Sequence, residues 1–161
     1  MAAVAGDLAK TETIVYVSRG VKASQNISKG DLITFDANGY AQQATTSSTR
    51  QSGFGIAAEA QNNGSGADGA LLLRIIVGGW AYCKAGGTIV PFALVSVASA
   101  TTVTASSLPS SVSPPGSQDV NAAMNLYAKA FGRYMGHEGD ISDETNAANA
   151  DVIAVALTES I

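Results

Sequence analysis

Residues suited to chemistry are few in this chain of 161 residues. His137 is the only histidine, and it stands between two glycines in the sequence GHEGD. A metalloprotease helix needs a second histidine four residues further on, which this chain lacks. Hydrolase triads also need a histidine, and no nucleophile elbow surrounds the serines or Cys83. We therefore interpret His137 as a surface-loop residue and predict a protein that is not an enzyme.

Acidic residues gather near the carboxyl end of the chain, at Asp140, Asp143, Glu144 and Asp151. Carboxylate oxygens are suitable ligands for calcium, but the spacing of these residues does not match an EF-hand loop. We interpret them as an acidic solvated loop, with a bound cation as the alternative. Cys83 is the only cysteine, which excludes an internal disulfide and a cysteine-built zinc site. The sequence thus predicts no cofactor and no metal.

Two motifs and one aromatic group are further candidates for binding. GSGADG, residues 64–69, matches G-x-G-x-x-G, but an apolar run follows it instead of a helix, so we interpret it as a flexible turn. The tripeptide at 29–31, KGD, is ordinary turn chemistry before a strand. Trp80, Tyr82 and Phe92 could form a platform for sugars or bases, although such residues are more typical of cores and subunit interfaces.

Composition narrows the class of protein. Charged residues make up 14% of the chain and the net charge is -4, which argues against direct binding of nucleic acid. The longest apolar run, ALLLRIIVGGWAYC, is too short to cross a bilayer and contains Arg74. The first residues do not resemble a secretory signal. We expect a soluble protein with no membrane partner.

The first part of the chain indicates short strands. TIVYV, residues 13–17, is rich in β-branched and aromatic residues. Ile33 and Phe35 share one face at the strand period of two, and Asn38-Gly39 predicts a type I′ hairpin turn before a return strand that begins at Tyr40. The small-residue stretch 1–12 is predicted to be a mobile N-terminal arm.

The middle of the chain continues this pattern. FGIAAEA predicts a strand, QNNGSGADG a loop, and ALLLRIIV a strand buried on both faces. Gly78-Gly79 is predicted to break that strand, and Pro91 divides the next apolar run into two short pieces or makes it an edge strand. Six residues are assigned as structural turns: Gly30, Asp31, Asn38, Gly39, Gly78 and Gly79.

The last part begins with a Ser/Pro-rich loop at about 106–117. Residues 117–136 fit a helix or a strand about equally, with a strand preferred for KAFGRYM, and DVIAVALTES predicts a final strand. The fold class is all-β: a compact β-barrel or β-tulip-like sandwich with at most one short helix, in a single domain over 13–161. GFGIAAEA…ALLLRIIVGG and AFGRYMGHEG…DVIAVAL also form a faint internal echo, which two copies alone do not establish as a repeat.

The order of these segments resembles that of the small capsid decoration, or head-cement, proteins of tailed bacteriophages and related viruses. The resemblance spans residues 20–158 and rests on GDLITFD…GYAQQA, GFGIAAEA, LLLRIIVGGWAYC, AGGTIVPF and FGRYMGHEG…DVIAVAL. The segments that are structural in that family correspond here to Gly30 and Asp31, to 55–57 and to 152–157. This chain departs from the family in its Ser/Pro-rich insertion and in a long polar loop at 138–150.

The resemblance implies a structural virion protein, made in the host cytoplasm, that binds the outer surface of an assembled capsid as a homo-oligomer, with a trimer favoured. The implied partner is the major capsid protein. The candidate interface residues are Ala2, Val4, Leu8, Trp80, Tyr82 and Phe92. We expect the N-terminal arm to add a strand to the capsid or to an adjacent copy. The alternative is a host-recognition or carbohydrate-binding β-module of a viral spike or fibre.

Overall fold

The protein is described by a computed structural model over residues 14–49, 52–106, 129–137 and 146–157. Strands make up 53% of the structure and helix 2%, so the all-β prediction is confirmed. The strands are β1 (Val15–Gly20), β2 (Gln25–Ile27), β3 (Leu32–Phe35), β4 (Ala41–Gln43), β5 (Phe54–Ala57), β6 (Gln61–Asn63), β7 (Leu72–Ala85), β8 (Leu94–Val97), β9 (Thr102–Ala105), β10 (Gly132–His137) and β11 (Val152–Leu157).

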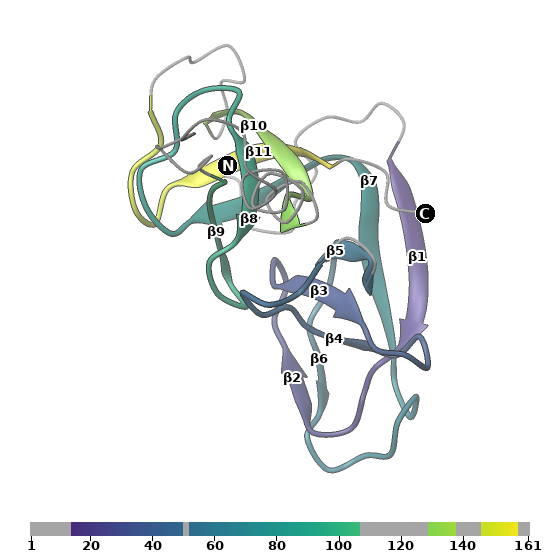
Figure 1. Cartoon of the computed structure of the whole chain (residues 1–161). Coiled ribbons are helices and arrows are strands. Elements are labelled where there is room, and N and C mark those ends of the chain that lie inside the picture. The colour runs from purple at the N-terminus through teal and green to yellow at the C-terminus, as the bar shows by residue number, and fades with distance from the viewer. Residues whose placement is uncertain (1–13, 50–51, 107–128, 138–145, 158–161) are drawn as a thin grey trace, which may run out of the picture.

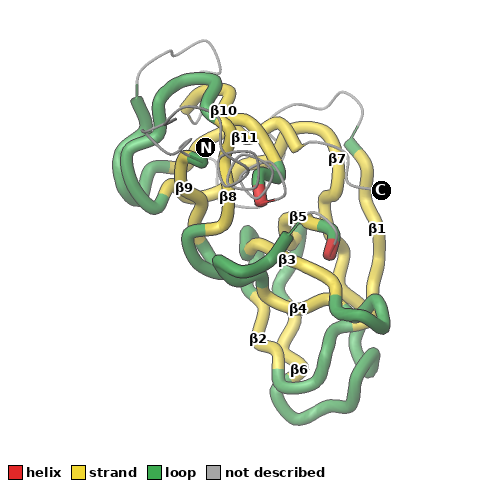
Figure 2. The backbone as a smooth tube through the Cα atoms, viewed as in Figure 1, coloured by secondary structure: helices red, strands yellow, loops and turns green. Residues whose placement is uncertain are grey.

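Two structural units share the long strand β7 (Figure 1). The first half of β7 pairs with β1 and β5, and β3 and β4 complete the N-terminal unit. The second half of β7 pairs with β11 and β9, and β10 and β8 close a five-stranded C-terminal barrel. Figure 2 shows the strands of the two units at opposite ends of β7. The short ribbon of β2 and β6 extends the N-terminal unit.

A parallel pairing closes both units at the same place. In the C-terminal barrel, β7 and β9 pair in parallel at Lys84↔Thr102 and Ala85↔Val103. In the N-terminal unit, the only parallel pair among the described residues is the bridge Val21↔Ala41. This unit is therefore an incompletely closed version of the barrel.

The sequence echo corresponds to a repeated structure. Each strand of the N-terminal unit has a counterpart, in the same order along the chain, in the C-terminal barrel: β1 and the second half of β7, β3 and β8, β4 and β9, β5 and β10, the first half of β7 and β11. The two FG sequences occupy the same position. A Cβ on Gly55 would approach Ile76 O at 2.8 Å, and one on Gly132 would approach Ala156 O at 2.9 Å.

Backbone hydrogen bonds outside the strand ladders repeat in the same way. In the N-terminal unit, these bonds run from N–H to carbonyl as Lys22 to Ala41 (2.9 Å), Gly30 to Ala57 (2.8 Å), Ala44 to Leu32 (2.8 Å) and Asp36 to Tyr40 (3.0 Å). Their counterparts in the C-terminal barrel, in the same order, are Gly86 to Val103 (2.7 Å), Phe92 to Tyr134 (3.1 Å), Ser106 to Leu94 (2.7 Å) and Ala98 to Thr102 (2.9 Å). The repeat is therefore one of geometry, although few side chains are the same.

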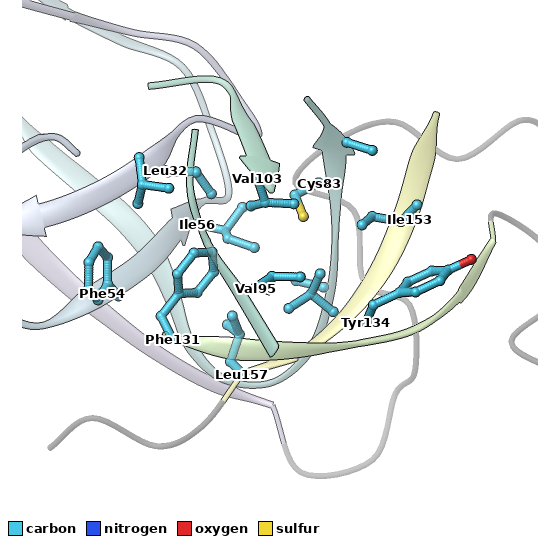
Figure 3. Close-up of a cluster of buried hydrophobic side chains, with 14 of the residues drawn as sticks. Leu32, Phe54, Ile56, Cys83, Val95, Val103, Phe131, Tyr134, Ile153 and Leu157 are labelled. Atoms are coloured by element: carbon cyan, nitrogen blue, oxygen red, sulfur yellow. The ribbon is translucent and has the colours of Figure 1, made fainter. Parts of the chain in front are cut away.

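Each unit has its own core. The cluster inside the N-terminal unit consists of Val21, Ile27, Ile33, Ala41, Ala57, Leu73 and Ile75. A larger cluster fills the C-terminal barrel and also includes Leu32, Phe54, Ile56 and Ile76 from the outer face of the N-terminal unit. Figure 3 shows Phe54 and Phe131 side by side, and their ring centroids are 5.1 Å apart. The two units thus meet through buried apolar side chains.

The predicted break at Gly78-Gly79 is wrong. β7 continues through both glycines and passes there from one unit into the other. Gly79 has a φ of 88°, a left-handed conformation that glycine adopts without steric cost. On the opposite strand the register shifts between Val15 and Tyr16, which is the sign of a bulge. The glycines therefore bend a continuous strand at the junction.

Three local predictions also differ from the structure. At the first hairpin only Gly39 has a positive φ, 81°, while Asn38 does not, so the turn is not type I′. The Gly39 N–H donates to Asp36 O at 2.9 Å, which is typical of a longer loop that ends in a left-handed glycine. The predicted loop QNNGSGADG contains strand β6. The start of ALLLRIIV is not buried on both faces, because Leu72 is 63% exposed.

Most of the remaining strand predictions agree with the structure. FGIA, the last strand and the preferred strand around FGRYM form β5, β11 and β10. The apolar run forms two short strands, β8 and β9, but both follow Pro91, and the division between them lies at the turn of residues 98–101 and not at the proline as predicted. The predicted N-terminal arm and most of the Ser/Pro-rich loop lie outside the described residues.

Candidate interaction surfaces

His137 is a structural residue of the C-terminal barrel. It ends strand β10 and is half-buried, so the predicted surface-loop position is wrong. Its Nδ1 lies 2.9 Å from the hydroxyl of the buried Tyr134, and its Nε2 lies 3.4 Å from Asp151 Oδ2. Asp151 Oδ2 also accepts a hydrogen bond from the Ala148 N–H at 2.7 Å. These contacts join β10 to the start of β11.

The remaining candidates for metal binding or nucleophilic chemistry are the acidic residues near the carboxyl end and Cys83. Asp140, Asp143 and Glu144 lie outside the described residues, and the described part of the chain holds no group of three potential metal ligands. Cys83 is fully buried, and burial raises the pKa of its thiol well above the ordinary value. A thiol in that state is a poor nucleophile.

The two loop motifs are anchored within the N-terminal unit. In GSGADG, Asp68 Oδ1 accepts a hydrogen bond from the Ala23 N–H at 2.7 Å, where a phosphate-binding loop would need a positive environment. In the KGD tripeptide, Asp31 is buried and its Oδ2 accepts hydrogen bonds from Ser28 N at 2.9 Å and Gln43 Nε2 at 2.7 Å. In both motifs the aspartate is therefore engaged by contacts within the N-terminal unit.

The three aromatic candidates do not form one platform. Tyr82 is buried, Trp80 is half-buried and Phe92 is 50% exposed. Trp80 stands at one end of a row of side chains across the outer face of the C-terminal barrel. The pairs Trp80↔Ala156, Arg133↔Ala156 and Arg133↔Leu94 place these four residues opposite one another on adjacent strands. We call this set the C-terminal row.

Phe92 lies beside the Leu94 end of the C-terminal row. Its carbonyl accepts a hydrogen bond from Arg133 Nη1 at 2.7 Å. Phe92 has a φ of 60°, and its counterpart in the N-terminal unit, Gly30, has a φ of 89°. A bulky residue in this region is a strained outlier. The structure thus keeps an exposed aromatic side chain where the other unit has a glycine.

The N-terminal unit has an exposed patch that the sequence did not indicate. It consists of Tyr16, Leu72 and Arg74, which lie on one face of the β1–β7 pair and which we call the N-terminal patch. Leu72 is 63% exposed and Tyr16 41% exposed, and the Arg74 guanidinium lies 5.3 Å from the centre of the Tyr16 ring. The continuous apolar run hid the patch, because only the register of β1 against β7 shows that Leu72 faces outward.

The N-terminal patch borders the edge strand β1. Among the described residues, β1 pairs along its length with β7 alone, and its other side is joined only by the bridge at Val21. Figure 1 shows β1 at the periphery of the unit. Unpaired N–H and C=O groups of such an edge can accept an additional strand. Ala2, Val4 and Leu8, the other predicted interface residues, lie outside the described residues.

Comparisons with known proteins give a similar solved structure but no matching family. No protein-family model matches the chain, and no curated protein matches it. Among solved structures, the chain is similar to the N base of the head fiber protein of bacteriophage phi29, with a TM-score of 0.49 and 10% sequence identity. The alignment covers 90% of this chain and 96% of that chain. This likeness is too distant to assign a function.

No helix within the described ranges is both long and apolar enough to cross a membrane.

Proposed function

We propose that this protein is a structural virion component that binds the outer surface of an assembled capsid and stabilises it by bridging neighbouring capsid subunits. The observation that carries the proposal is the N-terminal patch beside the edge strand β1. The resemblance of the sequence to capsid decoration proteins supports the same function.

The N-terminal patch has the composition of a binding surface. Exposed apolar side chains that cluster on a surface are typical of interaction sites, and tyrosine and arginine are enriched among the residues that dominate binding energy. Arg74 lies over Tyr16, and this cation–π contact favours the observed orientation of the ring. A preoriented ring loses little conformational freedom when a partner binds.

The edge of β1 gives this surface a second mode of contact. An extended segment of a capsid subunit could add a strand there through main-chain hydrogen bonds, while the patch supplies apolar contacts. Neither contact needs to be strong, because attachment at many sites of a regular shell raises the overall avidity. In this proposal the N-terminal unit and the C-terminal barrel are rigid supports and no chemical step takes place.

The proposal is tested by mixing the purified protein with undecorated capsid shells and imaging them by electron cryo-microscopy. We expect density at regular lattice positions and a higher melting temperature of the shell. The double variant Tyr16→Ser, Leu72→Ser should lose most of this occupancy. The control Val90→Ser removes a side chain that is 52% exposed on the C-terminal barrel and should retain it.

Three results would count against the proposal. If the wild-type protein does not attach, or if it attaches without changing shell melting, the stabilising role is wrong. If it binds members of a glycan array, the host-recognition alternative is favoured instead. Undiminished occupancy of the double variant would place the contact outside the N-terminal patch.

A further inference from the structure

The two units differ in what covers the row of side chains on the outer face of each unit. In the N-terminal unit, the residues equivalent to the C-terminal row are Tyr16, Ile76, Ile56 and Leu32, which pair across β1, β7, β5 and β3. Tyr16 is exposed, and the other three are fully buried because the C-terminal barrel packs against them (Figure 3). This outer face is therefore already a protein–protein interface, formed within one chain.

The C-terminal row stands in the same place on the second unit, and within the described ranges no other unit packs over its Arg133 and Leu94. Arg133 is exposed, Leu94 and Ala156 are half-buried, and the adjacent Phe92 is 50% exposed. Arginine and aromatic residues are enriched at the centres of interfaces. The strained backbone of Phe92, held by the hydrogen bond from Arg133, indicates that this side chain is kept exposed for contact.

The covered outer face of the N-terminal unit also receives a polar contact from a hairpin loop of the C-terminal barrel. The Leu32 N–H donates to the carbonyl of Ala100, in the β8–β9 hairpin, at 2.8 Å. The residue equivalent to Leu32 is Leu94, and the loop equivalent to 98–102 is 36–40. Ala37 and Asn38 are exposed at the tip of that loop, on the N-terminal unit. One chain thus displays both halves of a contact that it already makes once internally.

We propose that the C-terminal row docks the N-terminal unit of a second copy of this chain, with the 36–40 hairpin of one copy against Leu94 of the other. Arg133 replaces the buried Ile56, and the Asp36 carboxylate of the incoming hairpin is already paired with Lys22 at 3.4 Å, so the docking is supported by the repeated geometry and not by charge. The contact joins different surfaces of the two copies, so it generates a closed ring or an open chain.

This inference concerns the free protein and does not depend on binding to a capsid. The first test is sedimentation velocity of the full chain over a range of concentrations. The wild-type protein should associate, and Arg133→Glu should weaken the association constant by about tenfold or more. The control Arg19→Glu reverses an exposed arginine on β1 and should leave association unchanged.

The variant Phe92→Gly tests the effect of the exposed ring on association without disturbing the fold. Glycine adopts the left-handed conformation without strain, as Gly30 does at the equivalent position, so the thermal midpoint should stay close to that of the wild type. Association should still fall by about tenfold, because the exposed ring is lost. Normal association of Phe92→Gly, or a wild-type protein that stays monomeric throughout, would overturn the proposal.

A cross-link tests the orientation. Asn38→Cys and Leu94→Cys are prepared as separate proteins, and the native Cys83 is buried and does not compete. A covalent dimer should form on oxidation only when the two variants are mixed. A mixture of Asn62→Cys, which replaces another exposed asparagine, with Leu94→Cys should stay monomeric on a denaturing gel. Equal cross-linking in both mixtures, or none in the first, contradicts the docking geometry.

Discussion

The N-terminal unit and the C-terminal barrel share a strand order but differ in which of their equivalent residues are buried and which are exposed. The N-terminal unit buries Ile56 and its neighbours under the C-terminal barrel, while the C-terminal barrel presents Arg133 at the equivalent position. The C-terminal barrel closes with a full parallel pairing, whereas the N-terminal unit closes with a single bridge. Equivalent backbone positions can therefore serve a core in one unit and a surface in the other, because the side chains change while the hydrogen bonds do not.

The largest expected difference between the units is at this equivalent pair. Ile56→Ala should lower the free energy of unfolding by about 2–5 kcal/mol, since a fully buried side chain leaves a cavity. Arg133→Ala should cost below about 1 kcal/mol, because it removes one hydrogen bond from an exposed side chain. Urea unfolding of dilute protein measures both values. Equal losses would mean that the two outer faces are covered alike.

The two FG glycines should behave alike and so test the repeat itself. A Cβ on Gly55 would clash with Ile75 and lie 2.8 Å from Ile76 O, and one on Gly132 would lie 2.5 Å from Val155 Cγ1. Gly55→Ala and Gly132→Ala should each destabilise the protein by about 1–3 kcal/mol through overpacking.

Gly87→Ala is the matched control for the two FG glycines. A Cβ there would meet no atom within 4 Å, so the change should stay within about 0.5 kcal/mol. Thermal unfolding of the three variants side by side gives the comparison. A harmless Gly132→Ala would show that the second FG position is looser than the first.

The smallest expected effect is a difference in pH dependence between the 36–40 hairpin and the 98–102 hairpin. Desolvation acts to raise the pKa of Asp36, but hydrogen bonds from the N–H groups of Tyr40 and Asn38, together with Lys22, outweigh it and lower the pKa below the ordinary 3.8. The carboxylate therefore supports the 36–40 hairpin above pH 3.8, and this support is lost as the pH falls through the lowered pKa.

Amide hydrogen exchange of Asn38 and Tyr40 should accelerate at that acid pH. The 98–102 hairpin has Ala98 at the equivalent position and is held by hydroxyl contacts such as Ser99 Oγ to Thr102 Oγ1 at 2.8 Å, which do not titrate. Its exchange should show no such step. In Asp36→Asn the step should vanish from the first hairpin, and its persistence there would assign it to another carboxyl group.

Local patterns predicted much of the architecture. The β-branched and apolar runs indicated β5 and β11, and the two FG sequences indicated related hairpins. Residues of β2 and β6 were missed, because QNI and QNN are mostly polar and form a strand pair through backbone bonds. Gly78-Gly79 was misread since glycine pairs usually end strands, and only the shared use of β7 explains why this one does not.

The candidate surfaces were harder to predict than the strands. Trp80 and Phe92 stood out as aromatic residues, but the C-terminal row combines four strands and exists only in their register. The left-handed backbone of Phe92 has no local sequence signal, since phenylalanine is not expected there. The N-terminal patch was hidden in a run of leucines whose outward members cannot be identified before the partner strand is known.

The shared strand β7 has a mechanical consequence. Its 14 residues make one continuous strand, bent at the glycines and roughly 45 Å long along its path, that belongs to both units. Pulling the units apart along this strand would load the ladders with β1 and β11 in shear, so that many hydrogen bonds must break together. No flexible linker is present at this junction to absorb the force. A pulling force on one unit is therefore transmitted directly to the other.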